Sequence, residues 1–329
     1  MRLLVTGGCG FIGSNFIRYV LEHYDPEFIT NVDALTYAGS PTNTADLPQR
    51  FEDRYEFVRA DIADPQVMEQ VLSAHSYYAV INFAAESHVD RSIATPQHFV
   101  HSNVVGVGVL LEGARRHGVK RFVQVSSDEV YGPAGDEPCT EDSRLNPSSP
   151  YSASKAAADL LALACFKTFG QDVVITRGSN NYGPYQYPEK LIPLTIVRAL
   201  DGQAVPVYGD GLHRRDWLYV EDYCSAIFTA LMNGKAGEIY NVASGEEWAN
   251  LDLIRMILEL LGVSAELLQH VPDRPAHDRR YWIDTRKIRE ELGWKPMHRL
   301  EASLPRTIRW YEQSRPWWYA ALRAGSGAT

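Results

Sequence analysis

The chain of 329 residues is 45% hydrophobic and 22% charged, which is typical of a globular protein long enough for two lobes or one large α/β unit. Its formal net charge of -9 argues against the basic surface that nucleic acid or an anionic membrane selects, so an anionic ligand needs a local basic pocket. The four cysteines lack CxxC spacing, which indicates neither a disulfide framework nor a metal site and favours a reducing cytoplasm.

The N-terminal segment enters directly into an apolar run over residues 2–6, with no basic leader before it. We therefore expect no signal peptide, no membrane span and a cytoplasmic location. Similar runs rich in Val, Ile, Phe and Tyr alternate with helical patterns through the first half of the chain. That alternation predicts an α/β fold with a doubly wound parallel sheet covered on both faces. We expect strands over 2–6, 28–33, 55–61, 78–84 and 120–127, and helices over 11–24, from about 96 to 116 and over 151–169.

The strict alternation weakens beyond about Arg177, where Pro and Tyr become frequent in "NNYGPYQYPEKLIP". We expect a first domain over 1–178 and a smaller α/β lobe over 179–329, with part of 215–245 packing back on the first domain. The terminal "RAGSGAT", residues 323–329, is short and polar and predicts a disordered tail.

Glycines follow the first predicted strand in "VTGGCGFIGSNF" and open the first helix. Gly7, Gly10 and Gly13 have the spacing GxxGxxG, where missing side chains let a pyrophosphate approach the backbone and the helix N-terminus. A tightly packed turn is the alternative for the glycines alone. Their position favours a Rossmann-type dinucleotide site, which also includes the intervening Phe11 and Ile12.

Asp33 ends the second predicted strand, twenty positions after Gly13. A carboxylate there accepts hydrogen bonds from an adenosine ribose and repels a 2′-phosphate, which favours NAD over NADP. A turn or cap aspartate is the alternative. The predicted cofactor contacts also include four residues that follow the third and fourth strands: Asp61, Ile62, Ala84 and Ala85.

Tyr151 and Lys155 in "PYSASKAAADLL" are four residues apart at the start of a predicted helix, so their side chains share one face. The lysine charge favours the phenolate, and Ser127 ends an upstream strand where its hydroxyl can lie beside the phenol. The three residues predict a proton-abstracting set for an alcohol. In "QVSSDEVYG", Asp128 and Glu129 stand side by side after a buried strand, and a solvated turn is the alternative reading of that pair.

Seven motifs in this order resemble the extended short-chain dehydrogenase/reductase family, and more narrowly its nucleotide-sugar 4,6-dehydratases. The motifs are "TGGCGFIGSN", "NFAAESHVDRSI", "SSDEVYG", "SPYSASKAAAD", "NNYGPYQYPEKLIP", "RRDWLYVEDYC" and "RPAHDRRYWID". The resemblance implies NAD as cofactor and a glucose nucleotide as substrate, with dTDP-glucose favoured over UDP-glucose, which the sequence does not separate.

The resemblance also implies the roles of the catalytic residues. Tyr151 takes the proton of the sugar 4-hydroxyl while C4 is oxidised. Glu129 then removes the C5 proton, and Asp128 protonates the departing 6-hydroxyl. Two departures from the family stand out: Ser127 occupies a position where threonine is usual, and Gly178-Ser179 stand before Asn180 where cysteine is frequent.

Substrate contacts follow from the same resemblance. Lys190 and Arg215 would pair with the diphosphate, and Tyr208 would stack on the base, although a tyrosine after a strand is often only core. His88 is expected to be a wall of the pocket. The other implied contacts are Asn181, Glu189, Asn250 and His277.

Apolar residues on more than one face of the helices over 99–116 and 151–169 predict a homodimer joined through a four-helix bundle.

A nucleotide-sugar 4-epimerase would use Tyr151 and Lys155 without needing the acid pair. A protein that binds NAD only as a sensor would have no reason to keep all five catalytic residues.

Overall fold

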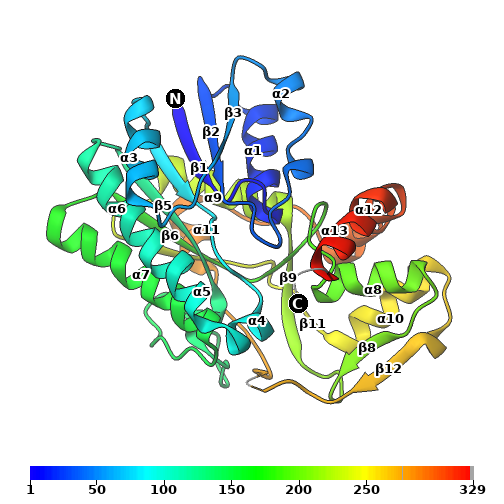
Figure 1. Cartoon of the computed structure of the whole chain (residues 1–329). Coiled ribbons are helices and arrows are strands. Elements are labelled where there is room, and N and C mark those ends of the chain that lie inside the picture. Colours follow the sequence, from blue (N-terminus) through cyan, green and yellow to red (C-terminus); the bar gives the residue numbers. More distant parts are fainter. Residues whose placement is uncertain (276, 327–329) are drawn as a thin grey trace.

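The structure is a computed structural model that describes residues 1–275 and 277–326 (Figure 1). Its centre is a seven-stranded sheet in the order β10-β6-β5-β4-β1-β2-β3, and every neighbouring pair is parallel. This confirms the predicted doubly wound sheet. The strands are β1 (Arg2–Thr6), β2 (Phe28–Asp33), β3 (Tyr55–Arg59), β4 (Ala79–Asn82), β5 (Arg121–Ser127), β6 (Val173–Gly178) and β10 (Ile239–Val242).

Helices cover both faces of the sheet because β1 and its neighbours are apolar on both sides. On one face, α1 (Phe11–His23), α9 (Val220–Asn233) and α11 (Arg286–Leu292) share a core with β1. On the other face lie α3 (Pro65–Ala74), α6 (Gly106–Arg116) and α7 (Pro150–Phe169). Shorter helices are α2 (Leu47–Arg50), α4 (Val89–Ala94) and α5 (Pro96–Val100).

The helix expected from about residue 96 is interrupted in the middle. A π-helical segment, His101–Val105, joins α5 to α6. Asn103 in this segment bonds the backbone of Glu86 in both directions and donates to the Ser154 hydroxyl at 2.8 Å. The wider helical turn therefore directs the Asn103 side chain toward the segment that follows β4. Such π-helical turns often occur near functional sites.

The smaller lobe contains two small sheets and four helices. One sheet has β7 (Asn180–Tyr182), β9 (Arg214–Tyr219) and β11 (Glu247–Ala249), and the other pairs β8 (Val205–Tyr208) with β12 (Leu268–Val271). The helices are α8 (Leu191–Leu200), α10 (Asn250–Leu261), α12 (Leu300–Gln313) and α13 (Arg315–Ser326). Tyr182, Trp217 and Trp318 belong to the buried core of this lobe. Since α13 continues to Ser326, the tail prediction is wrong for 323–326, and 327–329 lie outside the described residues.

The chain crosses between the lobes more than once. The segment that forms β9 in the small lobe continues into α9 and β10, which pack on and extend the large sheet. A single boundary between residues 178 and 179 stays a prediction.

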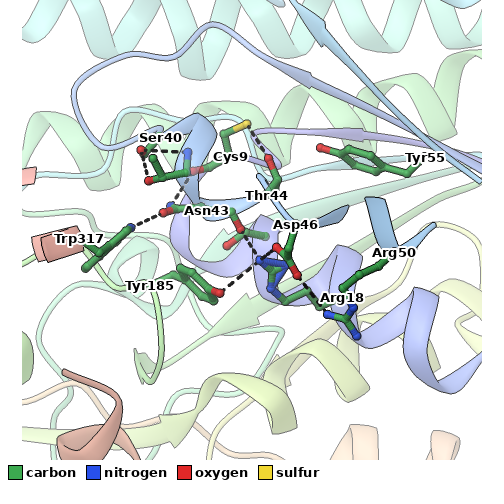
Figure 2. Close-up of polar contacts among 12 residues, drawn as sticks. Cys9, Arg18, Ser40, Asn43, Thr44, Asp46, Arg50, Tyr55, Tyr185 and Trp317 are labelled. Atoms are coloured by element: carbon green, nitrogen blue, oxygen red, sulfur yellow. Dashed lines mark hydrogen bonds and ion pairs between the residues drawn. The ribbon is translucent and has the colours of Figure 1, made fainter. Parts of the chain in front are cut away.

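Helix α13 contacts the large lobe at the loop that follows β2. Figure 2 shows Trp317, whose indole nitrogen donates to Asn43 Oδ1 at 2.8 Å, and Tyr185, whose hydroxyl accepts from the guanidinium of Arg18 at 3.2 Å. Arg18 also pairs with Asp46 and stacks over the Tyr185 ring at 4.8 Å. These contacts join the two lobes beside α1.

Among the described residues, no helix is both long enough and apolar enough to cross a bilayer.

Candidate active site

Two adjoining cavities open where the parallel strands end, the usual ligand position of such sheets. The first measures about 230 Å³ and the second about 310 Å³. They share part of their walls, including Phe11, Ile12, Tyr151, Glu189 and Lys190. A ligand in one cavity therefore meets a ligand in the other at Tyr151.

All twelve predicted cofactor residues line the first cavity: Gly7, Gly10, Phe11, Ile12, Gly13, Asp33, Asp61, Ile62, Ala84, Ala85, Tyr151 and Lys155. Gly7 has φ +73°, and a Cβ there would lie 2.5 Å from the backbone nitrogen of Ala84. Gly10 caps α1 without a side-chain acceptor, and the first turn of the helix has no acidic residue. The helix N-terminus thus keeps N–H groups for an anion, which fits a dinucleotide pyrophosphate.

Asp33 lies at the end of β2 with both carboxylate oxygens held by backbone donors. Oδ2 accepts from the Cys9 N–H at 2.9 Å and Oδ1 from the Leu35 N–H at 2.8 Å. Burial raises the Asp33 pKa, and the two N–H groups oppose this change. Asp61 is held in a similar way, since Oδ1 accepts from the Ala63 N–H at 2.9 Å.

Tyr151 and Lys155 lie on the first turns of α7, where Ser149 and Ser152 form a capping box. The Lys155 ammonium donates to the carbonyl oxygen of Val125 at 2.6 Å. Burial lowers the Lys155 pKa to about 8, and the charge of Asp159 opposes the change. Both ends of the predicted pair are therefore buried and fixed against β5.

The predicted lowering of the Tyr151 pKa by Lys155 is not found among the protein groups alone. Burial raises the pKa of the phenol, the charge of Glu129 raises it further, and a hydrogen bond with Ser127 lowers it. The Lys155 ammonium is turned toward a backbone carbonyl oxygen. The protein groups alone therefore do not favour the phenolate, and the positive nicotinamide ring of a bound NAD would add a charge that does.

Ser127, Asp128 and Glu129 begin a 3-10 turn, η3 (Asp128–Tyr131), directly after β5. The Ser127 hydroxyl accepts from the Glu129 N–H at 3.2 Å and donates to Asp128 Oδ1 at 3.3 Å. Burial and then the charge of Glu129 raise the Asp128 pKa well above its usual range. Burial also raises the Glu129 pKa, but Lys190 and Arg215 oppose it. Both pKa values are therefore raised, and nearby cations oppose the change more at Glu129 than at Asp128.

All eight predicted substrate residues line the second cavity: His88, Asn181, Glu189, Lys190, Tyr208, Arg215, Asn250 and His277. Its two predicted cations are firmly held. Lys190 Nζ donates to the Ser87 carbonyl oxygen at 2.9 Å, and Arg215 stacks over the Tyr281 ring at 4.3 Å. Arg215 is only 5% exposed. The cavity therefore supplies positive charge to an anionic ligand inside a protein that is acidic overall.

Three amide oxygens in this cavity lack a hydrogen-bond partner among the described residues, Asn181 Oδ1, Gln186 Oε1 and Asn250 Oδ1. Glu189 is different, because Oε1 already accepts from the Tyr37 hydroxyl at 2.9 Å. Burial and the nearby Lys190 lower the His88 pKa to about 4, so His88 is a neutral wall of the cavity near pH 7. Unpaired amide oxygens are suited to the hydroxyl and N–H donors of a ligand.

Three side chains that can bind metal, two histidines and one aspartate, lie close together, although no metal site was expected from the sequence. One ligand atom each from His213, Asp273 and His277 lies within 4.8 Å of the others. The Asp273 carboxylate faces both imidazoles, at 3.3 Å from His213 Nε2 and 2.6 Å from His277 Nδ1. The two rings stack at 3.7 Å and 16°, so their in-plane lone pairs cannot converge on one ion. Hydrogen bonding to Asp273 accounts for the cluster.

Sequence reasoning missed Arg274 and did not explain Gly178. Arg274 lines the second cavity, and its charge lowers the Glu129 pKa. It begins the motif "RPAHDRRY", from which only later residues were chosen. Gly178 has a steric role, because a Cβ there would lie 2.5 Å from Cζ of Tyr223. The glycine makes room for this buried phenol beside Ser127, its partner in the β5–β6 register.

Comparisons with known proteins agree with this geometry. The family model described as GDP-mannose 4,6 dehydratase matches residues 4–307. The dTDP-glucose 4,6-dehydratase of Streptomyces niveus is 49% identical over 322 residues, covering 97% of this chain and 95% of the relative. That of Escherichia coli K12 is 45% identical over 343 residues, with 96% and 94% covered.

Solved structures give the same result. The DesIV dTDP-glucose 4,6-dehydratase of Streptomyces venezuelae, solved with NAD bound, has a TM-score of 0.95 and 46% identity, with 98% of this chain and 100% of that chain covered. A UDP-glucose 4-epimerase of Thermotoga maritima has a TM-score of 0.89 and 30% identity, with 96% and 100% covered. The chain therefore belongs to the nucleotide-sugar dehydratase family whose model is described as GDP-mannose 4,6 dehydratase.

Proposed function

We propose that the protein is an NAD-dependent dTDP-glucose 4,6-dehydratase, which converts dTDP-glucose to dTDP-4-keto-6-deoxyglucose and water. One observation carries the proposal: the adjacent carboxyls of buried Asp128 and partly buried Glu129 line the same cavity as Tyr151. An epimerase of the same fold has no elimination for such a pair to perform. The names of the relatives, at 45–49% identity over nearly the whole chain, support dTDP-glucose as the substrate.

The first cavity would hold NAD, with the pyrophosphate at the N-terminus of α1 and the adenosine ribose at Asp33. NAD supplies a hydride acceptor for the sugar C4 and, after elimination, a hydride donor for C6. Tyr151 lies in the walls of both cavities, so its phenol can take the proton of the 4-hydroxyl. Lys155, one turn further along α7, would place a positive charge near the Tyr151 phenol.

Elimination then falls to the acid pair. Oxidation at C4 acidifies the C5 hydrogen, and Glu129 takes that proton as a base. Asp128, protonated because of burial and its neighbour, gives its proton to the 6-hydroxyl, which leaves as water. Glu129 returns the proton to C5 as C6 is reduced. Tyr151 then still holds the proton of the 4-hydroxyl and Asp128 lacks the one it gave to water, so transfer of a proton from Tyr151 to Asp128 within the shared cavity restores the starting state.

The nucleotide would occupy the basic end of the second cavity. Lys190 and Arg215 would pair with the diphosphate, and Arg274 adds a third cation. Tyr208 is 38% exposed, which leaves its ring free to stack on a base. Asn181 and Asn250 would accept hydrogen bonds through their unpaired amide oxygens.

Mass spectrometry tests the proposal directly. Purified protein incubated with dTDP-glucose should convert it to a product lighter by one water, with no stoichiometric consumption of NAD. UDP-glucose is the matched alternative and should react more slowly. Faster loss of water from UDP-glucose would reassign the nucleotide, and a product of unchanged mass with inverted C4 would identify an epimerase instead.

We infer that the protein acts as a homodimer in the cytoplasm. Three large apolar side chains are exposed on α7, Leu160 at 58%, Leu161 at 37% and Phe169 at 57%. Val100 and Val105 are also exposed on the neighbouring helical segment. A two-fold four-helix bundle would bury these residues. The four free cysteines support a reducing compartment.

A further inference from the structure

Arg177, near the end of β6, is a buried cation outside the two cavities. Its side chain is 2% exposed, and that of its ion-pair partner Asp159 is 0% exposed. Arg177 Nε donates to Asp159 Oδ2 at 2.9 Å. Arg177 Nη1 donates to the Tyr131 hydroxyl at 2.8 Å, and the guanidinium lies 4.8 Å from the centre of the Tyr131 ring. One guanidinium therefore holds two partners from different elements.

The partners belong to the two halves of the proposed chemistry. Asp159 lies on α7, one turn after Lys155 and two turns after Tyr151, on the same helical face. Tyr131 ends the short turn η3, which begins with Asp128 and Glu129. The bridge thus connects the helix that carries the oxidation residues to the turn that carries the elimination residues.

Other contacts fix the bridge at both ends. The Tyr131 hydroxyl donates to Asn241 Oδ1 on β10 at 2.8 Å. Arg177 pairs with Ser126 in the β5–β6 register, directly before the catalytic Ser127. Asp159 is also the opposing charge that raises the pKa of buried Lys155. Few groups in this region are free to move independently.

Stability alone is a weak reason for such an arrangement. Removing two charges from water carries a large desolvation cost, and apolar residues of similar size often stabilise a core as well as a buried ion pair does. An ion pair does, however, impose one geometry on the groups that it joins.

We propose that Arg177 is a positioning residue that holds Asp128 and Glu129 in register with Tyr151 and Lys155. The inference rests on the proposed function and adds to it. A carboxylate pair that shifts by a fraction of an ångström against the sugar loses proton-transfer rate, whereas oxidation at C4 depends on Tyr151 and Lys155 of α7, on Ser127 of β5 and on the cofactor.

Tyr131→Phe tests this by removing one hydroxyl. Oxidation is followed by stopped-flow absorbance of reduced cofactor, and elimination by quenched-flow mass spectrometry of water loss. We expect oxidation to stay within about twofold and elimination to slow about tenfold, so that reduced cofactor accumulates. Tyr77→Phe is the matched control, because Tyr77 is 5% exposed and its hydroxyl donates to Thr30 at 2.9 Å, far along the sheet. Equal slowing of both steps, or no slowing of elimination, would overturn the proposal.

A second measurement needs no substrate. Urea unfolding of Tyr131→Phe, Asp159→Asn and the double variant forms a cycle that measures coupling through Arg177. We expect the unfolding equilibrium constants to depart from additivity by at least about fivefold, and additive effects would contradict the bridge. If the unmodified protein removes no water from dTDP-glucose, the proposed function fails while this cycle still decides on the bridge. Tyr131→Phe kinetics remain decisive if Asp159→Asn does not fold.

Discussion

At the scale of single residues, adjacent carboxylates can do opposite work because their surroundings differ. Asp128 is 4% exposed and is held against Ser127, whereas the charge of Glu129 is compensated by Lys190, Arg215 and Arg274. Burial therefore favours the neutral form of the first carboxyl, and the cations favour the ionised form of the second, as the proposed acid and base roles need. Neither assignment is visible from the letters "DE" alone.

The acid pair can be separated from the oxidation residues by mutation. In Asp128→Asn/Glu129→Gln, Tyr151 keeps its role in oxidation, so reduced cofactor should build up after mixing with dTDP-glucose. Elimination should slow on the order of a hundredfold or more, as for the loss of a general acid or base. Stopped-flow absorbance and product mass measure the two steps. Product formation at the unmodified rate would make the carboxylates structural.

Lys155 links the active site to stability through its pKa, which burial lowers from 10.5 to about 8. Below pH 8 both folded and unfolded chains hold the proton, and the folded state bears the full cost of the buried charge. Between pH 8 and 10.5 the unfolded chain keeps a proton that the folded chain has lost, so stability rises with pH and the cost disappears.

Lys155→Met should therefore be more stable than the unmodified protein at pH 7. Removal of the buried charge contributes about 2–3 kcal/mol, and the unpaired Val125 carbonyl oxygen costs about 1 kcal/mol. The net gain of about 1–2 kcal/mol should vanish as the pH rises from 8 to 10.5. Urea unfolding after removal of bound nucleotide measures it. A difference independent of pH would show that the ammonium is not destabilised in the fold.

At the scale of elements, α13 belongs to the small lobe but forms hydrogen bonds with the large lobe. Trp317 donates to Asn43 Oδ1, and Asn43 Nδ2 in turn donates to the Cys9 carbonyl oxygen at 2.8 Å. The Cys9 N–H holds Asp33. A helix of the small lobe thus supports the carboxylate predicted to bind the adenosine ribose.

Trp317→Phe should weaken that support while the ring stays in place. Loss of the donor to Asn43, which is 1% exposed, should cost about 1–2 kcal/mol of stability and release NAD up to about tenfold faster. Trp310→Phe is the control, since the Trp310 indole N–H makes no hydrogen bond that the described structure records. NAD release followed by fluorescence measures the effect, and equal rates for both variants would disprove the link.

Short motifs at strand ends made much of the site predictable. The glycines, Asp33 and the acid pair each follow a strand of a parallel sheet, so the topology brings them to one edge. Contacts between distant segments could not be predicted in this way. Trp317 contacts Asn43, and Arg177 contacts Tyr131, only because separate elements pack together. The left-handed φ of 66° at Tyr185 could not be predicted either, because tyrosine rarely adopts that conformation.

At the scale of the whole molecule, the outer face of α7 exposes large apolar side chains that a second subunit could cover. Leu160→Glu would place a charge in the centre of the proposed bundle, where burial is costly. Light scattering should show a dimer for the unmodified protein and a shift toward monomer for the variant. Leu260→Glu on α10, where Leu260 is 46% exposed, is the control and should stay dimeric. A monomeric unmodified protein would refute the predicted assembly.

The hydrogen bond between Trp317 and Asn43 joins residues 274 positions apart, and this has a consequence for biosynthesis. A ribosome makes the glycine-rich turn and Asp33 early, but the helix that supports them emerges only after both lobes have been translated. The large sheet likewise waits for β10 at its edge. A nascent chain therefore carries an incomplete dinucleotide site through most of its synthesis. We therefore expect NAD to be captured stably only after translation, and a chain that ends before α13 to release NAD faster than the full chain does.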